Sequence, residues 1–436
     1  MNRKANIMVL IIVVSAGIAW YAWPRSPQAP RTRLPLGDGT SRAALEETIV
    51  TGRARLASDP SDAAAGVALA GALLRKARVS SDARCAIEAE QVLRGVLKRV
   101  PGEYSALKLL GAVYLSQHRF RDAIDASARA KAVRANDAWH DGVLGDAYLE
   151  LGDYDRAFDA FDSMAGRRPD AASYARVAYA LELQGKLRDA LAQMRRAAGA
   201  TGAGDPESLA WHYAQLGNLH FQMGELDSAA REYAHANHVF PGHPYARVGL
   251  ARVAAARGDL ATALGRYREL FDEAPTPELA AAIGDLLNAE GNRAAAMSMY
   301  ERAEVLERDG WKAEEPQPAA LARLLAERGL KREEAVGLAM EAASGRADIA
   351  TMDALAWAYF QAGRLEEARA ASGRARRTGT ADRRILYHAA AIEHALGNDQ
   401  DARRLLSRAL DGNPRFDLVA APAALALSRE LNLGRS

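Results

Sequence analysis

Histidines are the first side chains in this chain whose type and spacing could do chemistry. Five of the nine lie between His212 and His243, and His235 and His238 are three residues apart, on one face of any helix that holds them. Three or four converging imidazoles could bind zinc. The competing interpretation is ordinary packing inside helices together with solvated surface. We favour it, because nothing in the spacing brings a third ligand to the pair, and we expect no metal site.

Other catalytic patterns are missing from the sequence. There is no phosphate-binding glycine loop, no nucleophile elbow, no zinc-protease helix motif and no dinucleotide fingerprint. Cys85 is the single cysteine and has no neighbouring histidine, so we expect it to be structural. Adjacent acids such as Glu366 and Glu367 do not face each other on a helix. We therefore expect no catalytic residue, no cofactor and no enzymatic activity.

Composition narrows the fold class and the partners. The 436 residues include 57 basic and 55 acidic side chains, so the charge balance gives no reason to expect nucleic acid as a partner. One cysteine excludes a disulfide framework. Alanine is the commonest residue and aromatic residues make up only 6%, which favours closely packed helices over strands. A chain of this length should form several domains or a modular stack.

The N-terminal residues 7–23 form an uncharged apolar run, preceded by Arg3 and Lys4. The run is just long enough to cross a bilayer as a helix. Trp20, Tyr21 and Trp23 resemble an interfacial aromatic belt and make a poor signal-peptidase site. We predict an uncleaved anchor over residues 1–24, single-pass in the inner (cytoplasmic) membrane, with the following domain periplasmic or otherwise extracytoplasmic. A cleaved signal peptide is the alternative.

Glycine, a polar turn and a following alanine recur along the chain at nearly constant spacing. Gly152 leads to Ala157, for example, and Gly185 leads to Ala190. Ten alanines form the series, at intervals of 33, 34 or 39 residues: Ala89, Ala123, Ala157, Ala190, Ala229, Ala263, Ala296, Ala335, Ala368 and Ala402. A fixed period of this length indicates a protein built from repeated structural units.

This repeat resembles the tetratricopeptide repeat, a unit of 34 residues that forms two helices. The residues that carry the resemblance in one unit are Leu144-Gly145, Tyr148, Ala157, Phe161 and Pro169. A later unit supplies Leu216-Gly217, Ala229, Tyr233, Ala236 and Pro241 in the same register. The resemblance implies an all-α fold, a right-handed solenoid of helix pairs, in a bacterial protein. In such a stack each unit contacts only its neighbours.

The chain then divides as follows. Residues 25–40 are rich in Pro, Arg and Gly and should form a flexible linker. Residues 41–60 should form a capping helix, and residues 61–415 about ten helix pairs, with longer loops near 199–208 and 309–318. Residues 416–436 should form a second capping helix and a tail, because an open stack needs a polar cap at each end.

The resemblance also implies a binding groove, because the first helix of each unit lines the concave face of such stacks. The positions that it indicates are Trp139, Asp146, Arg176, Tyr179, Trp211, Asn218, Phe221, Gln222, Tyr245, Arg252, Trp357 and Phe360. Aromatic and arginine side chains are frequent anchors of protein interfaces. The alternative is that Trp139, Trp211 and Trp357 only wedge adjacent units apart.

These features are compatible with three functions to different degrees. The preferred one is a membrane-tethered scaffold that binds a protein or peptide partner in the concave groove. An envelope-biogenesis or secretion accessory, or a chaperone-like factor that holds a client protein, is the alternative. An enzyme is disfavoured, since helix pairs account for almost every residue after 60 and no catalytic constellation is visible.

Overall fold

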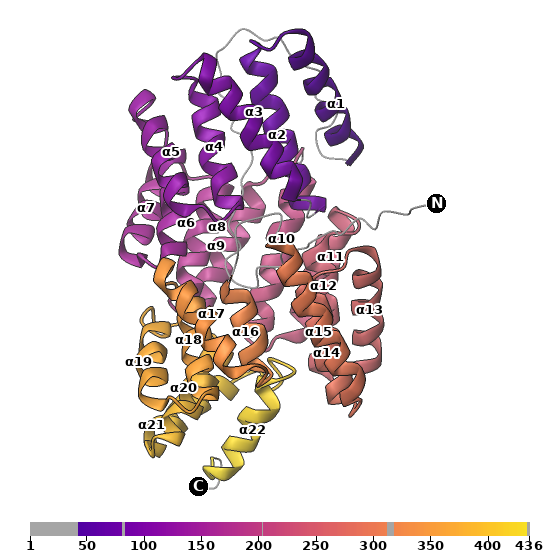
Figure 1. The fold of residues 1–436 in the computed structure, drawn as a ribbon, viewed down its shortest axis with the longest axis vertical. Coiled ribbons are helices and arrows are strands. Elements are labelled where there is room, and N and C mark those ends of the chain that lie inside the picture. The colour runs from indigo at the N-terminus through magenta and orange to yellow at the C-terminus, as the bar shows by residue number, and fades with distance from the viewer. Residues whose placement is uncertain (1–41, 81–82, 203, 312–317, 434–436) are drawn as a thin grey trace.

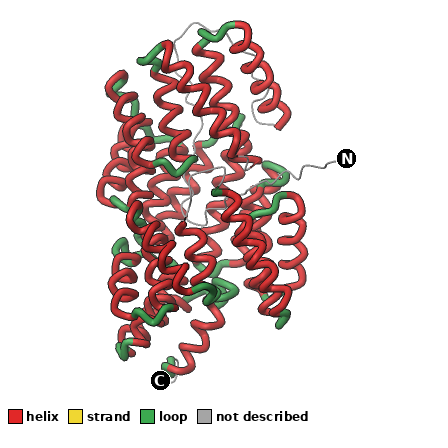
Figure 2. Tube along the Cα trace, viewed as in Figure 1, coloured by secondary structure: helices red, strands yellow, loops and turns green. Residues whose placement is uncertain are grey.

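The computed structural model describes residues 42–80, 83–202, 204–311 and 318–433, which form 22 α-helices and no strand (Figures 1 and 2). The all-helical expectation is confirmed for this part of the chain. The proposed anchor, residues 1–24, and the proposed linker, residues 25–40, lie outside the described residues. Among the helices that are described, none has both the length and the apolar character needed to cross a bilayer.

Helices α2 to α21 form ten consecutive pairs, which we number as units 1 to 10. The first helices of the units are α2 Ala63–Ser80, α4 Tyr104–Ser116, α6 Trp139–Leu151, α8 Ala171–Leu183, α10 Pro206–Gln222, α12 Pro244–Arg257, α14 Pro277–Ala289, α16 Pro318–Glu327, α18 Ile349–Gln361 and α20 Arg383–Ala395.

The second helices of the units are α3 Ala83–Arg99, α5 Phe120–Val133, α7 Tyr154–Arg167, α9 Leu187–Ala200, α11 Leu226–Val239, α13 Leu260–Glu273, α15 Arg293–Gly310, α17 Arg332–Gly345, α19 Leu365–Ala375 and α21 Asp399–Leu410. Helix α1 Arg42–Ser58 precedes the pairs, and α22 Ala420–Glu430 follows them.

Local chemistry sets the ends of these helices. Asp170 and Ser173 form a reciprocal capping box at the start of α8, which satisfies two amides that the helix leaves free. Proline is the first residue of α10, α12 and α14, where its missing amide costs no hydrogen bond. Pro169, Pro241 and Pro275 each follow shortly after a second helix ends, because proline cannot continue it.

The periodic alanines lie at the tightest contacts. All ten are at most 1% exposed, as expected for residues buried between the two helices of a unit. Gly217, on the first helix of its unit, also allows the two helices to pack closely: a methyl group there would lie 2.6 Å from the ring of Tyr233. Gly145 leaves room for the ring of Phe161 in the same way. The small residues of the repeat are thus explained by the close approach of large ones.

The two 39-residue intervals contain longer helices beside the expected loops; residues 312–317, most of the loop expected near 309–318, lie outside the described residues. The first addition mainly lengthens α10, which has 17 residues where α6 and α8 have 13. The second lengthens α15 to 18 residues. Much of each addition therefore continues a helix, because its residues extend a helical segment at low cost once the segment is nucleated.

Contacts also join units that are six repeats apart, so the expectation of neighbour-only contacts is wrong. The amide of Ala347 donates to the carbonyl of Leu151 at 3.2 Å. The amide of Ile349 donates to the hydroxyl of Tyr154 at 2.8 Å. These bonds link unit 3 to unit 9, and in Figure 1 α17 and α18 lie below α6 and α7. The solenoid has therefore turned far enough for its second turn to meet its first.

Equivalent contacts join unit 4 to the loop before α20 and unit 5 to the loop before α22. A methyl group at Gly185 of unit 4 would lie 2.8 Å from the carbonyl oxygen of Gly379, before α20. Asn413, before α22, donates to the carbonyl of Phe221 in unit 5 at 3.0 Å. Arg383 donates to the carbonyl of Gln222 at 2.8 and 2.9 Å. We call this contact, between the turns of units 3 to 5 and the loops before α18, α20 and α22, the seam.

Candidate functional site

The twelve side chains expected to line the groove all lie on first helices, but they differ in burial. Five are less than a tenth exposed: Trp139, Asp146, Arg176, Phe221 and Trp357. The other seven are partly buried: Tyr179, Trp211, Asn218, Gln222, Tyr245, Arg252 and Phe360. None has the exposure of a free surface residue. Their role in binding stays a prediction, and only the second group offers surface to a partner.

Asp146 and Arg176 pair with each other rather than face the groove as free charges. Arg176 Nη2 lies 2.7 Å from Asp146 Oδ2, and Arg176 Nε lies 3.0 Å from Asp146 Oδ1. Burial raises the pKa of the Asp146 carboxyl, against the opposing effect of the Arg176 charge. Two buried charges that satisfy each other fix the register between α6 and α8. This pair is therefore part of the scaffold.

Trp357 is likewise held inside a stack. Its ring lies 3.9 Å from that of His388 and 4.7 Å from that of Phe360, both nearly parallel to it. His388 also faces Asp353, with 3.0 Å between Nδ1 and Oδ2. These contacts join α18 to α20, which supports the wedge interpretation for this tryptophan. Its partly exposed neighbour Phe360 presents the edge of the stack.

Partly exposed polar side chains of α10 and α12 form one group. Arg252 lies 4.4 Å over the ring of Phe221, and its Nη1 is 3.4 Å from Asn218 Oδ1. The hydroxyl of Tyr233 donates to the same amide oxygen at 2.7 Å. No carboxylate of the described residues pairs with Arg252, so most of its donors remain available.

Gln222 extends this group towards α8. Its Nε2 donates to Glu182 Oε1 at 2.5 Å. Burial, opposed by that hydrogen bond, raises the pKa of Glu182 to about 7. The arrangement therefore offers a partner neutral amides and a guanidinium, next to a carboxyl that is partly protonated near neutral pH.

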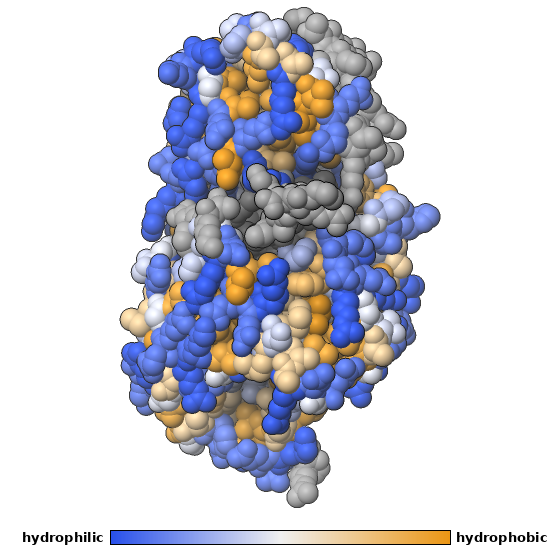
Figure 3. Space-filling view, turned by 45° about the vertical axis from the view of Figure 1, so that its right-hand side comes forward, coloured by the Kyte–Doolittle hydropathy of each residue, from blue (hydrophilic) through white to orange (hydrophobic). Residues whose placement is uncertain are grey.

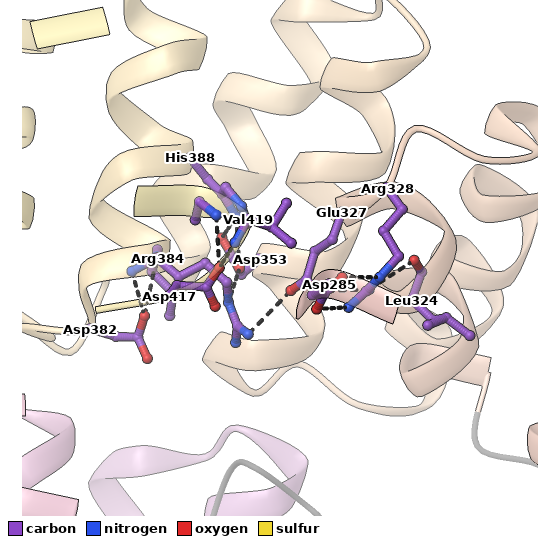
Figure 4. A network of polar contacts seen from close by, with 12 residues as sticks. Asp285, Leu324, Glu327, Arg328, Asp353, Asp382, Arg384, His388, Asp417 and Val419 are labelled. Atoms are coloured by element: carbon purple, nitrogen blue, oxygen red, sulfur yellow. Dashed lines mark hydrogen bonds and ion pairs between the residues drawn. The ribbon is translucent and has the colours of Figure 1, made fainter. Parts of the chain in front are cut away.

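A second set of inner residues, on units 7 to 10, was not singled out from the sequence (Figure 4). Arg328 binds Asp285 through two hydrogen bonds, of 3.0 and 2.6 Å. Glu327 lies beside Arg328 and also pairs with Arg384 at 3.1 Å. Alternating charges thus connect α14, α16 and α20. Burial raises the pKa of Asp285, against the effect of the Arg328 charge.

The repeat register could have found this second set. Asp285 lies 33 residues after Arg252, at the same position of its unit. Arg328 corresponds to Gln222 in the same way, and Arg384 to Tyr245. Applying the register to every unit, instead of selecting mainly aromatic residues, would have identified a polar inner face along the whole stack.

The histidines do not converge. His235 stacks on Tyr213 with 3.8 Å between ring centres, and His220 Nδ1 lies 2.5 Å from Glu225 Oε2. His212 lies 3.1 Å from the hydroxyl of Thr201. In the described ranges, no group of three or more His, Cys, Asp or Glu side chains could hold a metal ion. Cys85 is buried.

Comparison with known proteins agrees with this geometry. Two segments, residues 143–208 and 220–286, match family models described as tetratricopeptide repeat. No curated protein matches the sequence.

Solved structures are similar at low identity. The human IFIT1 dimer with m7Gppp-AAAA is 13% identical, with a TM-score of 0.50 over 78% of this chain and 77% of that one. A tetratricopeptide repeat protein from Parabacteroides merdae is 17% identical, with a TM-score of 0.40 over 54% of this chain and 93% of that one. Pseudomonas aeruginosa pilF is 16% identical, with a TM-score of 0.38 over 47% and 91%. The fold and the two matched segments show that this chain contains tetratricopeptide repeats.

Proposed function

We propose that this protein is a non-enzymatic scaffold that binds a protein or peptide partner along the inner face of its superhelix. Tetratricopeptide repeats suggest a protein-interaction scaffold, and their fold is generally non-catalytic. The observation that carries the proposal is the set of partly exposed side chains on three successive first helices: Tyr179, Asn218, Gln222, Tyr245 and Arg252. An extended polypeptide that follows the inner face would contact these side chains one after another.

The chemistry of this set fits a polypeptide better than a small metabolite. Amides such as Gln222 can bond a peptide backbone, and the Arg252 guanidinium can bond a carboxylate or a carbonyl. Aromatic and arginine side chains contribute most of the binding energy in many protein interfaces. On the face drawn in Figure 3, hydrophilic side chains lie between apolar patches.

A photo-cross-linking experiment tests the site. A photoreactive amino acid in place of Tyr245, on the inner face, should give a covalent adduct with a discrete polypeptide in the native cell. The same residue in place of Val305, which is 46% exposed on α15, serves as the control. Adducts of the same proteins from both positions would contradict binding along the inner face.

We further propose that residues 1–24 tether the scaffold to the inner membrane, with the repeats on the extracytoplasmic side. The uncharged run 7–23, the basic residues before it and the aromatic residues at its end support this. Deleting residues 1–24 should move the protein from the membrane fraction to the soluble fraction with unchanged helical content. A reporter fused to the C-terminus should be active only outside the cytoplasm, and activity inside would reverse the topology.

A further inference from the structure

Most basic side chains of the first helices from α4 to α20 bind a carboxylate of the same chain. These ion pairs are Lys108 with Asp137, Arg176 with Asp146, Arg247 with Glu273, Arg257 with Asp227, Arg328 with Asp285, and Arg384 with Glu327. Arg383 instead donates to the backbone carbonyls of Gln222 and Ala409. A cation that is matched in this way within the chain has no need of a charge from a partner.

Arg252, on α12, is one exception. Its contacts are with the ring of Phe221 and, at 3.4 Å, with the amide oxygen of Asn218, and both of these groups are neutral. Its side chain is partly exposed, so a partner can reach it. Because a guanidinium stays protonated at every physiological pH, the positive charge of Arg252 remains unmatched.

Arg323, on α16, is the second exception, since it forms neither a hydrogen bond nor an ion pair with any described residue. Burial and the like charge of Arg384 lower its pKa. The nearby Glu327 already pairs with Arg384 at 3.1 Å and lies 3.4 Å from Arg328, as Figure 4 shows. The other nearby carboxyl, Glu278, has its pKa raised to about 8 by burial, so it is mostly neutral at pH 7. Arg323 is also partly exposed.

Neighbouring polar groups connect these two arginines along one face. The charges of Arg252 and Asp285 act in opposite directions on the pKa of Tyr267, on α13, which burial raises. Asp285, on α14, binds Arg328 at 2.6 Å, and the charge of Arg328 acts in turn on Arg323. An extended polypeptide that crosses α12, α14 and α16 can therefore contact both unmatched guanidinium groups.

The chemistry of the unmatched groups selects the ligand. A carboxyl without a counter-charge can become neutral by binding a proton, whereas a guanidinium cannot lose its charge and needs an anion. Its planar fork of donors fits a carboxylate through two parallel hydrogen bonds. We propose that the partner polypeptide is acidic where it crosses the inner face, and that its side-chain carboxylates bind Arg252 and Arg323. This inference rests on the proposed function and adds the chemical class of the partner.

Thermal unfolding tests whether Arg323 is kept for binding or for the fold. Arg323→Gln breaks no ion pair and should leave the Tm unchanged or raise it. Arg328→Gln is the matched contrast, because it breaks the pair with Asp285 and should lower the Tm by several degrees. A decrease in Arg323→Gln as large as that in Arg328→Gln would show that Arg323 holds the helices together, and it would overturn the assignment.

Peptide binding tests the preference for acidic side chains. The probe is a dye-labelled peptide, blocked at both ends, in which glutamate alternates with glycine. In an extended chain its carboxylates recur about every 7 Å, so that two of them can reach the two arginines. The control peptide has glutamine in place of glutamate and therefore the same shape without the charge. Blocking the ends ensures that only side-chain carboxylates are measured.

Fluorescence anisotropy with the full chain at low ionic strength gives the two affinities. We expect the glutamate peptide to bind at least about tenfold more tightly than the glutamine peptide. The double variant Arg252→Gln with Arg323→Gln should remove this preference. Arg302→Gln, which removes an exposed arginine on α15, should preserve it. Equal affinities in the parent chain, a preference that survives the double variant, or an equal loss in Arg302→Gln overturns the proposal.

This experiment and the cross-linking experiment can fail separately. The photoreactive residue at Tyr245 reports the native partner whatever its charge. A discrete adduct there, together with equal affinities for the two peptides, would reject the acidic partner and keep the binding face. A glutamate preference together with the same adducts from Tyr245 and Val305 would instead reject the proposed function.

Discussion

Two groups of glycine turns look alike in sequence and differ in what surrounds them. Each links the two helices of a unit and has a left-handed backbone, with φ between 73° and 83°. In the first group, a side chain would meet the backbone of a later unit: Gly152, Gly185 and Gly224. In the second group, nothing lies within 4 Å of the added atom: Gly291, Gly363 and Gly397.

The difference separates two reasons for glycine at one repeat position. In the open turns, glycine is needed only because other residues rarely adopt a positive φ. In the seam turns, it is needed also because two backbones touch. The repeat pattern specifies the first requirement in every unit. The second arises only where the superhelix has completed a turn and meets itself.

The largest effect should come from Gly224→Ala. The added methyl would clash with Gly412, so the cost of overpacking adds to the cost of a left-handed alanine. We expect a loss of about 3–5 kcal/mol in the free energy of unfolding, measured by urea denaturation. Gly291→Ala, the matched change in an open turn, should lose only about 1–2 kcal/mol. Equal losses in the two variants would show that the seam is not formed in solution.

Removing a charge from the seam should have the next largest effect. Arg346→Ala leaves Glu150 buried without its partner, and this should cost about 2 kcal/mol, because the carboxyl can relieve part of the penalty by taking up a proton. The control is Arg364→Ala, which removes an exposed pair with Glu367 beside an open turn and should cause no measurable change. Adding Glu150→Gln to the Arg346 variant should recover stability in thermal unfolding. If stability does not recover, the loss in Arg346→Ala comes instead from its contact with the ring of Phe120, whose centre lies 5.0 Å from Cζ of Arg346.

The contrast between the two groups of turns also shows which contacts could be predicted from the sequence alone. Local signals predicted the helix pairs, because the spacing of Ala157, Ala190 and their equivalents records a contact inside each unit. They also located the repeat residue Gly217, which the structure places against the ring of Tyr233. The seam left no such signal, since the residues beside Gly152 and those beside Ala347 belong to ordinary repeats and are about 195 positions apart.

The inner face was predictable in position but not in pairing. The register located Asp146 and Arg176 on first helices, but it could not show that they bind each other and are withdrawn from the groove. Similarly, Trp357 was recognisable as an inner residue, whereas its stacking on His388 depends on the angle between α18 and α20. Pairing of this kind depends on side-chain geometry between units, which a periodic pattern does not encode.

The pH dependence of stability gives a third comparison, between one buried carboxyl at the seam and one away from it. Burial raises the pKa of Glu150 and of Glu278 to about 8. Their folded forms hold protons that the unfolded chain releases above about pH 4.3, so the free energy of unfolding should fall as the pH rises from there to about 8. Glu150→Gln and Glu278→Gln should each reduce this slope, by at most about 1.4 kcal/mol per pH unit.

Only one of these two variants should alter the seam. Glu150→Gln should make the exchange protection of Ala347 independent of pH, and Glu278→Gln, in unit 7, should leave its pH dependence unchanged. If Glu278→Gln also abolished the response at Ala347, the proton would act on the whole superhelix, and the distinction between seam and open regions would not hold for its electrostatics.

The smallest effect should come from the last hydrogen bond of the seam. Asn413 is 3% exposed, and its side chain is a donor to the Phe221 carbonyl at the end of α10. That carbonyl is one of the acceptors that a helix end leaves unpaired, so Asn413→Ala should cost about 1 kcal/mol. Asn288→Ala, which removes an exposed amide on α14, should cost nothing measurable. If Asn413→Ala also lowers the exchange protection of the Ala347 amide, two units away along the seam, then the contacts of the seam form cooperatively. If protection changes only beside α10, the contact of each unit across the seam forms independently of the others.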